Sequence, residues 1–226
     1  TLLHSHRRLV LAILAVAIVV FPAGLANAAD DESIENQYLS NVRQLTSDFV
    51  KAGEGYFSPD GQQIIYQAVR GDYPFYKIYT QPLEGGEPQL LSTGRGRTTC
   101  SYFSPDGQKI LFSSSHLDPN LDETEAAEIR QLEEDARTGK RRRYSWDFDP
   151  YMEIFEADLD GGNMKRLTDA KGYDAEGAYS SDGKLIAFCS DRDGDPDLYV
   201  MNSDGSDLRQ LTNAPGYDGG PFISPD

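Results

Sequence analysis

Short apolar runs recur along the chain at nearly constant intervals, and each follows a turn of the same composition. The turn phrase Phe-Ser-Pro-Asp-Gly, or a close variant of it, occurs four times, with its serine at Ser58, Ser104, Ser180 and Ser224. The first three phrases precede apolar runs typical of buried strands, at 64–66, 110–112 and 185–188. The serines lie 44 to 46 residues apart, with one larger interval. A period of this size indicates a propeller or a solenoid.

Two further features keep fixed distances from the phrase. A Leu-Thr or Leu-Ser pair lies thirteen residues before each phrase serine, at Leu45, Leu91, Leu167 and Leu211. An apolar–aromatic pair begins thirteen residues before three of these leucines, at Ile78, Ile154 and Leu198. Turns rich in glycine separate the runs and supply the positive φ that tight hairpins need. The pattern predicts four antiparallel strands per unit, the first ending in the phrase, and four such strands make one propeller blade.

These motifs resemble the TolB-like, WD40-like PD40 repeat family of β-propellers. The likeness is close over 198–205, which reads Leu-Tyr-Val-Met-Asn-Ser-Asp-Gly, and over 209–212, which reads Arg-Gln-Leu-Thr. It covers residues 41–226 apart from an insertion at 116–150. The resemblance implies an all-β propeller of four-stranded antiparallel blades, here about three blades and one strand. It implies little about activity, because related propellers serve the periplasmic Tol–Pal scaffold, prolyl oligopeptidase-type peptidases and polysaccharide lyases.

The second unit is enlarged by the insertion at 116–150, between its second and third strands. Asp122 offers an N-cap with an acid three residues on, apolar residues follow at helical spacing, and Gly139 suits the position after a helix. We expect a helix of about four turns. The bases Lys140, Arg141, Arg142 and Arg143 follow it, then Tyr144 and the single tryptophan, Trp146. The bases suit a helix C-terminus, and acids within 121–143 offer internal partners for much of their charge.

Alternate loops of a four-stranded meander share one end of the blade. The phrase turns therefore lie on one face, the turn face, whereas the insertion, the loop at 191–197 and the loops that enter each first strand lie on the opposite face, the loop face. Binding is usually placed where long loops gather on a regular scaffold. At the first-strand entrances, Asp174 and Asp218 lie six residues before the phrase serine, and Glu54 and Glu176 lie four before it. Other residues, Ala52, Thr98, Cys100 and Gly220, occupy the equivalent positions in the remaining units.

Acids around the channel mouth, with a cationic and aromatic insertion beside them, suit a zwitterionic or peptide-like partner. The acids are not required by the blade, because the equivalent positions of other units lack them. The candidate binding residues are Lys140, Arg141, Arg142, Arg143, Tyr144, Trp146, Asp174, Glu176 and Asp218.

Composition excludes several classes of function. The formal net charge is −16, so the chain repels the phosphates of nucleic acids. Beyond residue 28 the only histidine is His116, expected as a solvated loop residue, so a multi-histidine metal site cannot form. No Gly-x-Ser-x-Gly motif of a serine hydrolase occurs. The acidic loop at 191–197 resembles a calcium loop, but Asn202 stands where the bidentate acid belongs, and an ordinary turn is favoured. We expect no catalytic residue, metal or cofactor in this segment.

Residues 1–28 have the pattern of a secretory signal peptide. A basic start is followed by an apolar stretch at 9–21 and by the small-x-small site Ala26-Asn27-Ala28. An uncleaved anchor is the alternative. We expect cleavage after Ala28, a periplasmic or secreted protein without stable membrane insertion, and a linker at 29–40. Export permits a disulfide, but Cys100 and Cys189 lie at unrelated repeat positions and are expected as buried free thiols.

The ends of the repeat region bear on the size of the protein. Residues 41–46 match a fourth strand with no unit before it, and 221–226 match a first strand with no unit after it. Only three whole units lie between, whereas propellers typically use four to eight blades, so we expect a fragment of a longer protein. The favoured function is an exported, non-enzymatic scaffold that binds an envelope protein or a peptide-like ligand. The alternatives are the non-catalytic propeller of a larger prolyl oligopeptidase-type peptidase and a carbohydrate-acting propeller.

Overall fold

The computed structural model of the protein describes residues 36–143, 145–146 and 148–226. The chain divides into two compact units, residues 1–43 and residues 44–226. Of the first unit only 36–43 are described, with a turn at 36–38. The expected signal peptide at 1–28, the first part of the linker and Tyr144 lie outside the described residues. Within the described part, no helix has the length and apolar character needed to cross a membrane.

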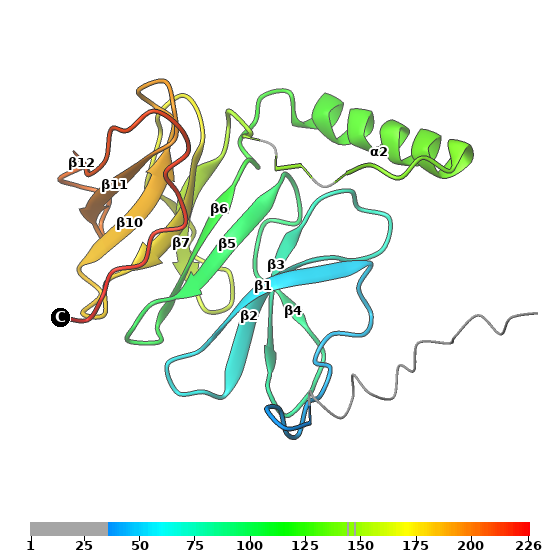
Figure 1. Ribbon diagram of the computed structural model, residues 1–226, viewed down its shortest axis with the longest axis horizontal. Coiled ribbons are helices and arrows are strands. Elements are labelled where there is room, and N and C mark those ends of the chain that lie inside the picture. Colours follow the sequence, from blue (N-terminus) through cyan, green and yellow to red (C-terminus); the bar gives the residue numbers. More distant parts are fainter. Residues whose placement is uncertain (1–35, 144, 147) are drawn as a thin grey trace, which may run out of the picture. The chain divides into compact units, whose positions relative to one another are not determined.

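The second unit contains three four-stranded antiparallel sheets (Figure 1). The first consists of β1 (Lys51–Phe57), β2 (Gln63–Val69), β3 (Lys77–Pro82) and β4 (Gln89–Leu90). The second consists of β5 (Thr98–Phe103), β6 (Lys109–Ser114), β7 (Glu153–Asp158) and β8 (Lys165–Arg166). The third consists of β9 (Asp174–Tyr179), β10 (Leu185–Ser190), β11 (Asp197–Asn202) and β12 (Arg209–Gln210). In each sheet the spatial order follows the chain order, which confirms the prediction of propeller blades.

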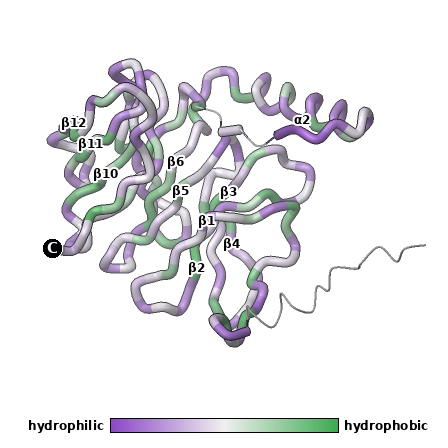
Figure 2. The backbone as a smooth tube through the Cα atoms, viewed as in Figure 1, coloured by the Kyte–Doolittle hydropathy of each residue, from purple (hydrophilic) through white to green (hydrophobic). Residues whose placement is uncertain are grey.

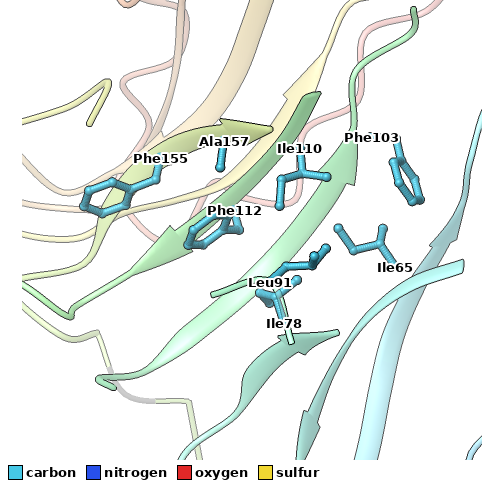
Figure 3. Packing of buried hydrophobic residues seen from close by; sticks show 8 residues of the cluster. All are labelled: Ile65, Ile78, Leu91, Phe103, Ile110, Phe112, Phe155 and Ala157. Carbon is cyan, nitrogen blue, oxygen red and sulfur yellow. The ribbon is translucent and has the colours of Figure 1, made fainter. Parts of the chain in front are cut away.

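The hydrophobic core lies between neighbouring blades. Figure 3 shows one cluster, in which Ile65, Ile78 and Leu91 of the first blade pack against residues of the second, including Ile110 and Phe112. A second cluster joins the second and third blades and uses Leu111, the residue between these two. Successive residues of a strand point to opposite faces of the sheet. The uninterrupted apolar run in β6 is therefore explained by burial on both faces.

The repeated phrase builds the same turn in each blade. Ser58 Oγ donates to Asp60 Oδ1 over 2.6 Å and accepts a hydrogen bond from the Gln63 amide. Asp60 Oδ1 also accepts from the Gln62 amide, and Gly61 has a φ of 68°, a conformation that favours glycine. The serine-to-aspartate bond recurs at Ser104 and Asp106 and at Ser180 and Asp182. The phrase is thus explained by turn geometry, and its residues need no ligand to account for them.

The insertion contains one helix, α2 (Leu121–Thr138), which runs beyond the blades and is largely hydrophilic (Figures 1 and 2). Gly139 ends it in the left-handed region, as the sequence predicts, and donates its amide hydrogen to the Asp135 carbonyl. The expected N-cap at Asp122 is wrong, because Asp122 lies in the first turn. Asp118 instead accepts hydrogen bonds from the Asn120 amide and the Thr124 hydroxyl. The helix therefore begins earlier and is longer than predicted.

The two end segments of the repeat region, the two cysteines and His116 test further predictions from the sequence. No strand forms at 41–46 or at 221–226, because a strand needs a hydrogen-bonded neighbour and no described strand pairs with either segment. Cys100 and Cys189 are free and buried, as expected. His116 is not a solvated side chain: its ring packs on Phe155 with centroids 4.4 Å apart, and its Nδ1 lies 2.9 Å from Ser114 Oγ.

Candidate binding cavity

The first strands of the three blades share an unusual bulge. The register of each strand shifts against its neighbour within the blade, and the bulges contain Glu54 in β1, Cys100 in β5 and Glu176 in β9. These three residues have φ values of 44°, 52° and 62°. A positive φ costs a residue other than glycine about 1–3 kcal/mol, and such strain is concentrated at functional sites. Gly220, at the equivalent position of the next repeat, has a φ of 63°.

The three bulge residues line a cavity of about 590 Å³. The strand β5 contacts both β1 and β9, so the cavity lies where the blades converge. Its aromatic lining comes from Tyr56, Tyr102, Trp146, Phe148, Tyr217 and Phe222. Because Trp146 and Phe148 belong to the insertion, the cavity lies at the loop-face end of the blades. Its volume is in the range of sites that hold a small ligand or a large side chain.

Glu176 is held in place by hydroxyl groups. Tyr217 Oη lies 2.7 Å from both carboxylate oxygens, and Tyr173 Oη lies 3.3 Å from one of them. The Trp146 indole donates to Tyr173 Oη over 3.0 Å, so the insertion is linked to Glu176 through one tyrosine. Burial raises the pKa of Tyr173 and of Tyr217, which keeps both hydroxyls protonated. Glu176 therefore has a fixed position, set by residues from the insertion and from two different repeats.

Glu54 faces the same cavity with weaker support. Cys100 Sγ donates to its Oε2 over 3.8 Å, the long separation of a bond from sulfur. Burial raises the pKa of Glu54, and the neighbouring charge of Glu176 raises it further. Burial likewise raises the pKa of the Cys100 thiol well above its ordinary value, so this thiol is a poor nucleophile. Among the described residues, no lysine or arginine forms an ion pair with Glu54 or Glu176.

The acidic candidates divide into one cavity residue and two others. Glu176 lines the cavity, together with the candidate Trp146. Asp174 is only 1% exposed, and Arg192 Nη2 lies 2.9 Å from both of its carboxylate oxygens, so its partner is supplied within its own blade. Asp218 is half-buried and is not among the lining residues. Its backbone amide donates to the Pro196 carbonyl over 2.8 Å. The position six residues before the phrase serine therefore lies beside the cavity.

The basic candidates lie on the helical insertion and do not line the cavity. Arg142 pairs with Glu128 at 2.8 Å and with Asp135 at 2.6 Å, which is the internal pairing that the acids of 121–143 allow. Lys140, Arg141 and Arg143 are exposed, and none has an ion pair in the part of the chain that the structure describes. Tyr144 lies outside the described residues. Arg142 thus serves the insertion itself, and the three exposed bases are the ones open to a partner.

The insertion is anchored to the loops of the first blade. Arg95 forms ion pairs with Asp122 and Glu125 of α2, and the Tyr73 hydroxyl also donates to Glu125. Arg97 pairs with Asp149 at 3.3 Å, close to the return of the chain into β7. These contacts place the insertion and the first-blade loops on one face, as the topology predicts. They also hold the segment that carries Trp146 and Phe148 over the cavity.

The acidic loop at 191–197 uses its carboxylates within the protein. Asp193 accepts from the Tyr199 hydroxyl at 2.6 Å, Asp195 accepts from the Gly216 amide at 2.9 Å, and Asp197 contacts the Thr212 hydroxyl at 3.2 Å. Within the described residues, no group of three or more His, Cys, Asp or Glu side chains is arranged to hold a metal ion. The carboxylates of this loop therefore support the loop and the neighbouring strand.

Sequence reasoning overlooked most of the aromatic wall. Tyr56, Tyr102 and Phe222 each lie two residues before a phrase serine, and this repeated aromatic position could have been found by the same counting that found Glu54 and Glu176. The three rings contact one another, with centroids 4.8 Å apart for Tyr56 and Tyr102, 6.0 Å for Tyr56 and Phe222, and 6.3 Å for Tyr102 and Phe222. Tyr217 lies seven residues before Ser224, as Tyr173 lies seven before Ser180, so the same counting could have found it. Phe148 keeps no repeat offset, and its place in the cavity follows only from the packing of the loops.

The three blades and their meander topology define the protein as a β-propeller. Residues 138–226 match the family described as the TolB beta propeller domain (PD40). The structure is similar to a TolB from Agrobacterium tumefaciens, with a TM-score of 0.59 and 22% identity, over 80% of this chain and 53% of that one. It is also similar to TolB from Acinetobacter baumannii, with a TM-score of 0.51 and 22% identity, over 74% of this chain and 33% of that one. The protein thus has the β-propeller fold, and its residues 138–226 carry the TolB-like match.

Other solved propellers resemble the chain to a similar degree. A puromycin-hydrolyzing peptidase from Mycobacterium tuberculosis has a TM-score of 0.52 and 15% identity, over 76% of this chain and 24% of that one. At such identities the likeness concerns the fold alone. The chain spans about half the length of the Agrobacterium protein and about a quarter of the peptidase.

Proposed function

We propose that the protein is an exported, non-enzymatic binding scaffold of the cell envelope, which receives an envelope protein or a peptide-like ligand at the cavity. The observation that carries the proposal is the cavity itself, with its aromatic wall and two carboxylates that lack an ion-pair partner within the described residues. Concave, mostly apolar sites with a few fixed polar groups are the usual form of a ligand site. The TolB-like fold supports a scaffold, because its blades place long loops on one face.

The cavity wall is suited to a protein segment. Aromatic side chains offer a large contact area at a low cost in conformational entropy, and they are enriched where partners bind. The hydroxyl groups of Tyr217 and Tyr173 also hold Glu176, and Trp146 donates to Tyr173, so the polar part of the site is organised before a ligand arrives. The exposed bases Lys140, Arg141 and Arg143 precede Trp146 by three to six residues. They provide a second contact for an acidic region of the partner and accelerate its approach.

Site-specific photo-crosslinking in the producing cell tests this function. A photoreactive phenylalanine analogue replaces Phe148 at the cavity, and a matched variant carries it at Gln108, an exposed residue of the turn face. We expect the variant at position 148 to form a discrete crosslinked product, whose partner is then identified by mass spectrometry. Equal products from both positions, or a product from position 108 alone, would show that the working face has been assigned to the wrong end of the propeller.

The contribution of the exposed bases is tested separately. Replacing Lys140, Arg141 and Arg143 by alanine leaves Arg142 to pair with the helix. We expect a lower crosslinking yield from position 148 with an almost unchanged melting temperature, because exposed charges contribute little to stability. Replacing Asp60 on the turn face by alanine is the control. A lower yield from the Asp60 variant alone would contradict a role for the bases.

Export is tested by N-terminal sequencing of the protein recovered from the periplasm or the medium. We expect the mature chain to begin at Ala29, the residue after the Ala26-Asn27-Ala28 site. Retention of Arg7 and Arg8 in the recovered protein would contradict cleavage and would favour the membrane anchor.

A second candidate is the propeller domain of a larger peptidase, which the fold similarity to the puromycin-hydrolyzing peptidase favours. The coding sequence beyond Asp226 separates the two. Further PD40 repeats followed by a stop codon would support the scaffold. A downstream domain with a Gly-x-Ser-x-Gly motif would support the peptidase, and the cavity would then face a substrate.

A further inference from the structure

We infer that the cavity selects a cationic group on an apolar stem, held between Glu54 and Glu176 and against the aromatic wall. A primary ammonium or a guanidinium has this chemistry, as at the end of a lysine or arginine side chain in an extended peptide. The inference rests on the proposed function and names the part of the ligand that enters the site.

The charge of the cavity is unbalanced. Glu54 and Glu176 lie on the first strands of different blades and face the same partly open cavity. Neither has an ion-pair partner in the described part of the chain, whereas Asp174, two residues from Glu176, is fully paired by Arg192. Two carboxylates that share a partly dry site repel one another, and a cation between them relieves this repulsion. The fold thus pairs the acid that it buries and leaves unpaired the two acids of the cavity.

The backbone presents these carboxylates on strained bulges. Both glutamates occupy bulges with positive φ, a conformation in which glycine is favoured, as at the equivalent Gly220. A bulge redirects the side chain that it carries. Retaining glutamate at a strained position lowers stability, and nothing in the packing of the blade requires it, since Cys100 occupies the same position in β5. The strain is therefore better explained by a ligand than by folding.

The remaining wall of the cavity offers aromatic rings and one hydroxyl group. Tyr56, Tyr102 and Phe222 form a continuous aromatic group, and Trp146 and Phe148 lie on the insertion side. Aromatic faces attract cations, most strongly where water is excluded. Ser101 also lines the cavity, is 1% exposed, and its Oγ has no hydrogen-bond partner among the described residues. An unused buried hydroxyl beside the carboxylates adds an acceptor for an N–H donor.

The same features disfavour other ligands. An anionic group would meet two carboxylates of its own sign, and a purely apolar group would exclude water from both without supplying a counter-charge. A cation on an apolar stem neutralises the charge of the carboxylates and packs against the rings. The ligand therefore needs both the positive charge and the apolar stem.

Trp146 makes the inference directly measurable, because it is the only tryptophan of the chain and it lines the cavity. The full chain is titrated with phenethylammonium and, in parallel, with 2-phenylethanol and 3-phenylpropionate, which share its ring but are neutral and anionic. We expect phenethylammonium to change the tryptophan fluorescence with an affinity about tenfold or more above that of either analogue. Added salt should weaken this binding.

Variants assign the effect to the two carboxylates. We expect Glu54→Gln and Glu176→Gln each to weaken phenethylammonium binding about tenfold and to leave 2-phenylethanol binding almost unchanged. Glu133→Gln, on the exposed surface of α2, is the matched control and should bind as the unchanged protein does. Melting curves check that each variant is folded. If one glutamate variant does not fold, the other alone is sufficient for the test.

The outcomes separate this inference from the proposed function. Equal affinity for the cation and the alcohol, or unchanged cation binding in a folded glutamate variant, would overturn the inference. Crosslinking from position 148 would then still support a binding scaffold with an apolar ligand. Selective cation binding without any crosslinked partner would support the inference and would indicate a small cationic ligand in place of an envelope protein.

Discussion

Lys77 provides the most demanding test of the electrostatics near the insertion. Its side chain is buried, with Nζ 2.5 Å from the Gly96 carbonyl oxygen and 3.7 Å from the centre of the Tyr73 ring. Burial lowers its pKa from 10.5 to about 7, although Glu125 nearby raises it. The lysine thereby links the strand β3 to the loop that anchors α2. We predict that Lys77→Met changes how stability depends on pH.

The direction follows from the proton balance. Below pH 7 the lysine is charged in both the native and the unfolded states, and folding bears the cost of burying the charge. Between pH 7 and 10.5 the unfolded chain holds a proton that the native chain has lost, so the free energy of unfolding rises with pH. The slope is about 1.4 kcal/mol per pH unit, and the whole window corresponds to roughly 5 kcal/mol. Lys77→Met lacks this rise.

Urea denaturation from pH 7 to 10.5, followed by circular dichroism, measures the effect. The methionine also loses the hydrogen bond to Gly96, at a cost of about 1–3 kcal/mol that does not vary with pH. The slope is therefore the diagnostic quantity. Lys171→Met, at an exposed position, is the matched control and should keep the slope of the unchanged protein. Parallel curves for the Lys77 variant and the unchanged protein would refute the reasoning.

Two further predictions concern contacts between and within blades. Gly161→Ala should lower the free energy of unfolding, measured by urea denaturation, by more than Gly85→Ala does. Both glycines have positive φ at the same turn position. A Cβ at 161 would lie 2.4 Å from the Leu91 carbonyl oxygen, whereas a Cβ at 85 meets nothing within 4 Å. Equal losses would show that the blade contact is unimportant. Asp174→Asn should cost about 3 kcal/mol, because it leaves the Arg192 charge without its buried partner, and a thermal melt within error of the unchanged protein would contradict this.

The repeat pattern in the sequence was sufficient to predict most of the fold. The phrase turns, the apolar runs and the glycine turns are each specified over a few neighbouring residues, because local hydrogen bonds such as that between Ser58 and Asp60 decide them. Their fixed spacing then predicted four strands per blade, which the structure confirms. The same counting pointed to Glu54 and Glu176, since an offset from the phrase is an offset along the first strand.

The tertiary structure decided what these residues do. Asp174 and Glu176 are two residues apart and both carry a carboxyl group, yet Arg192 pairs with the first and the cavity receives the second. Arg142 and Arg143 are adjacent, yet only Arg142 reaches Glu128 and Asp135. Phe148 and Tyr217 meet with ring centroids 5.9 Å apart, although almost seventy residues separate them. Local sequence determines a turn or a strand because its hydrogen bonds close within a few residues, whereas a cavity is formed by side chains that only the packing of blades and loops brings together.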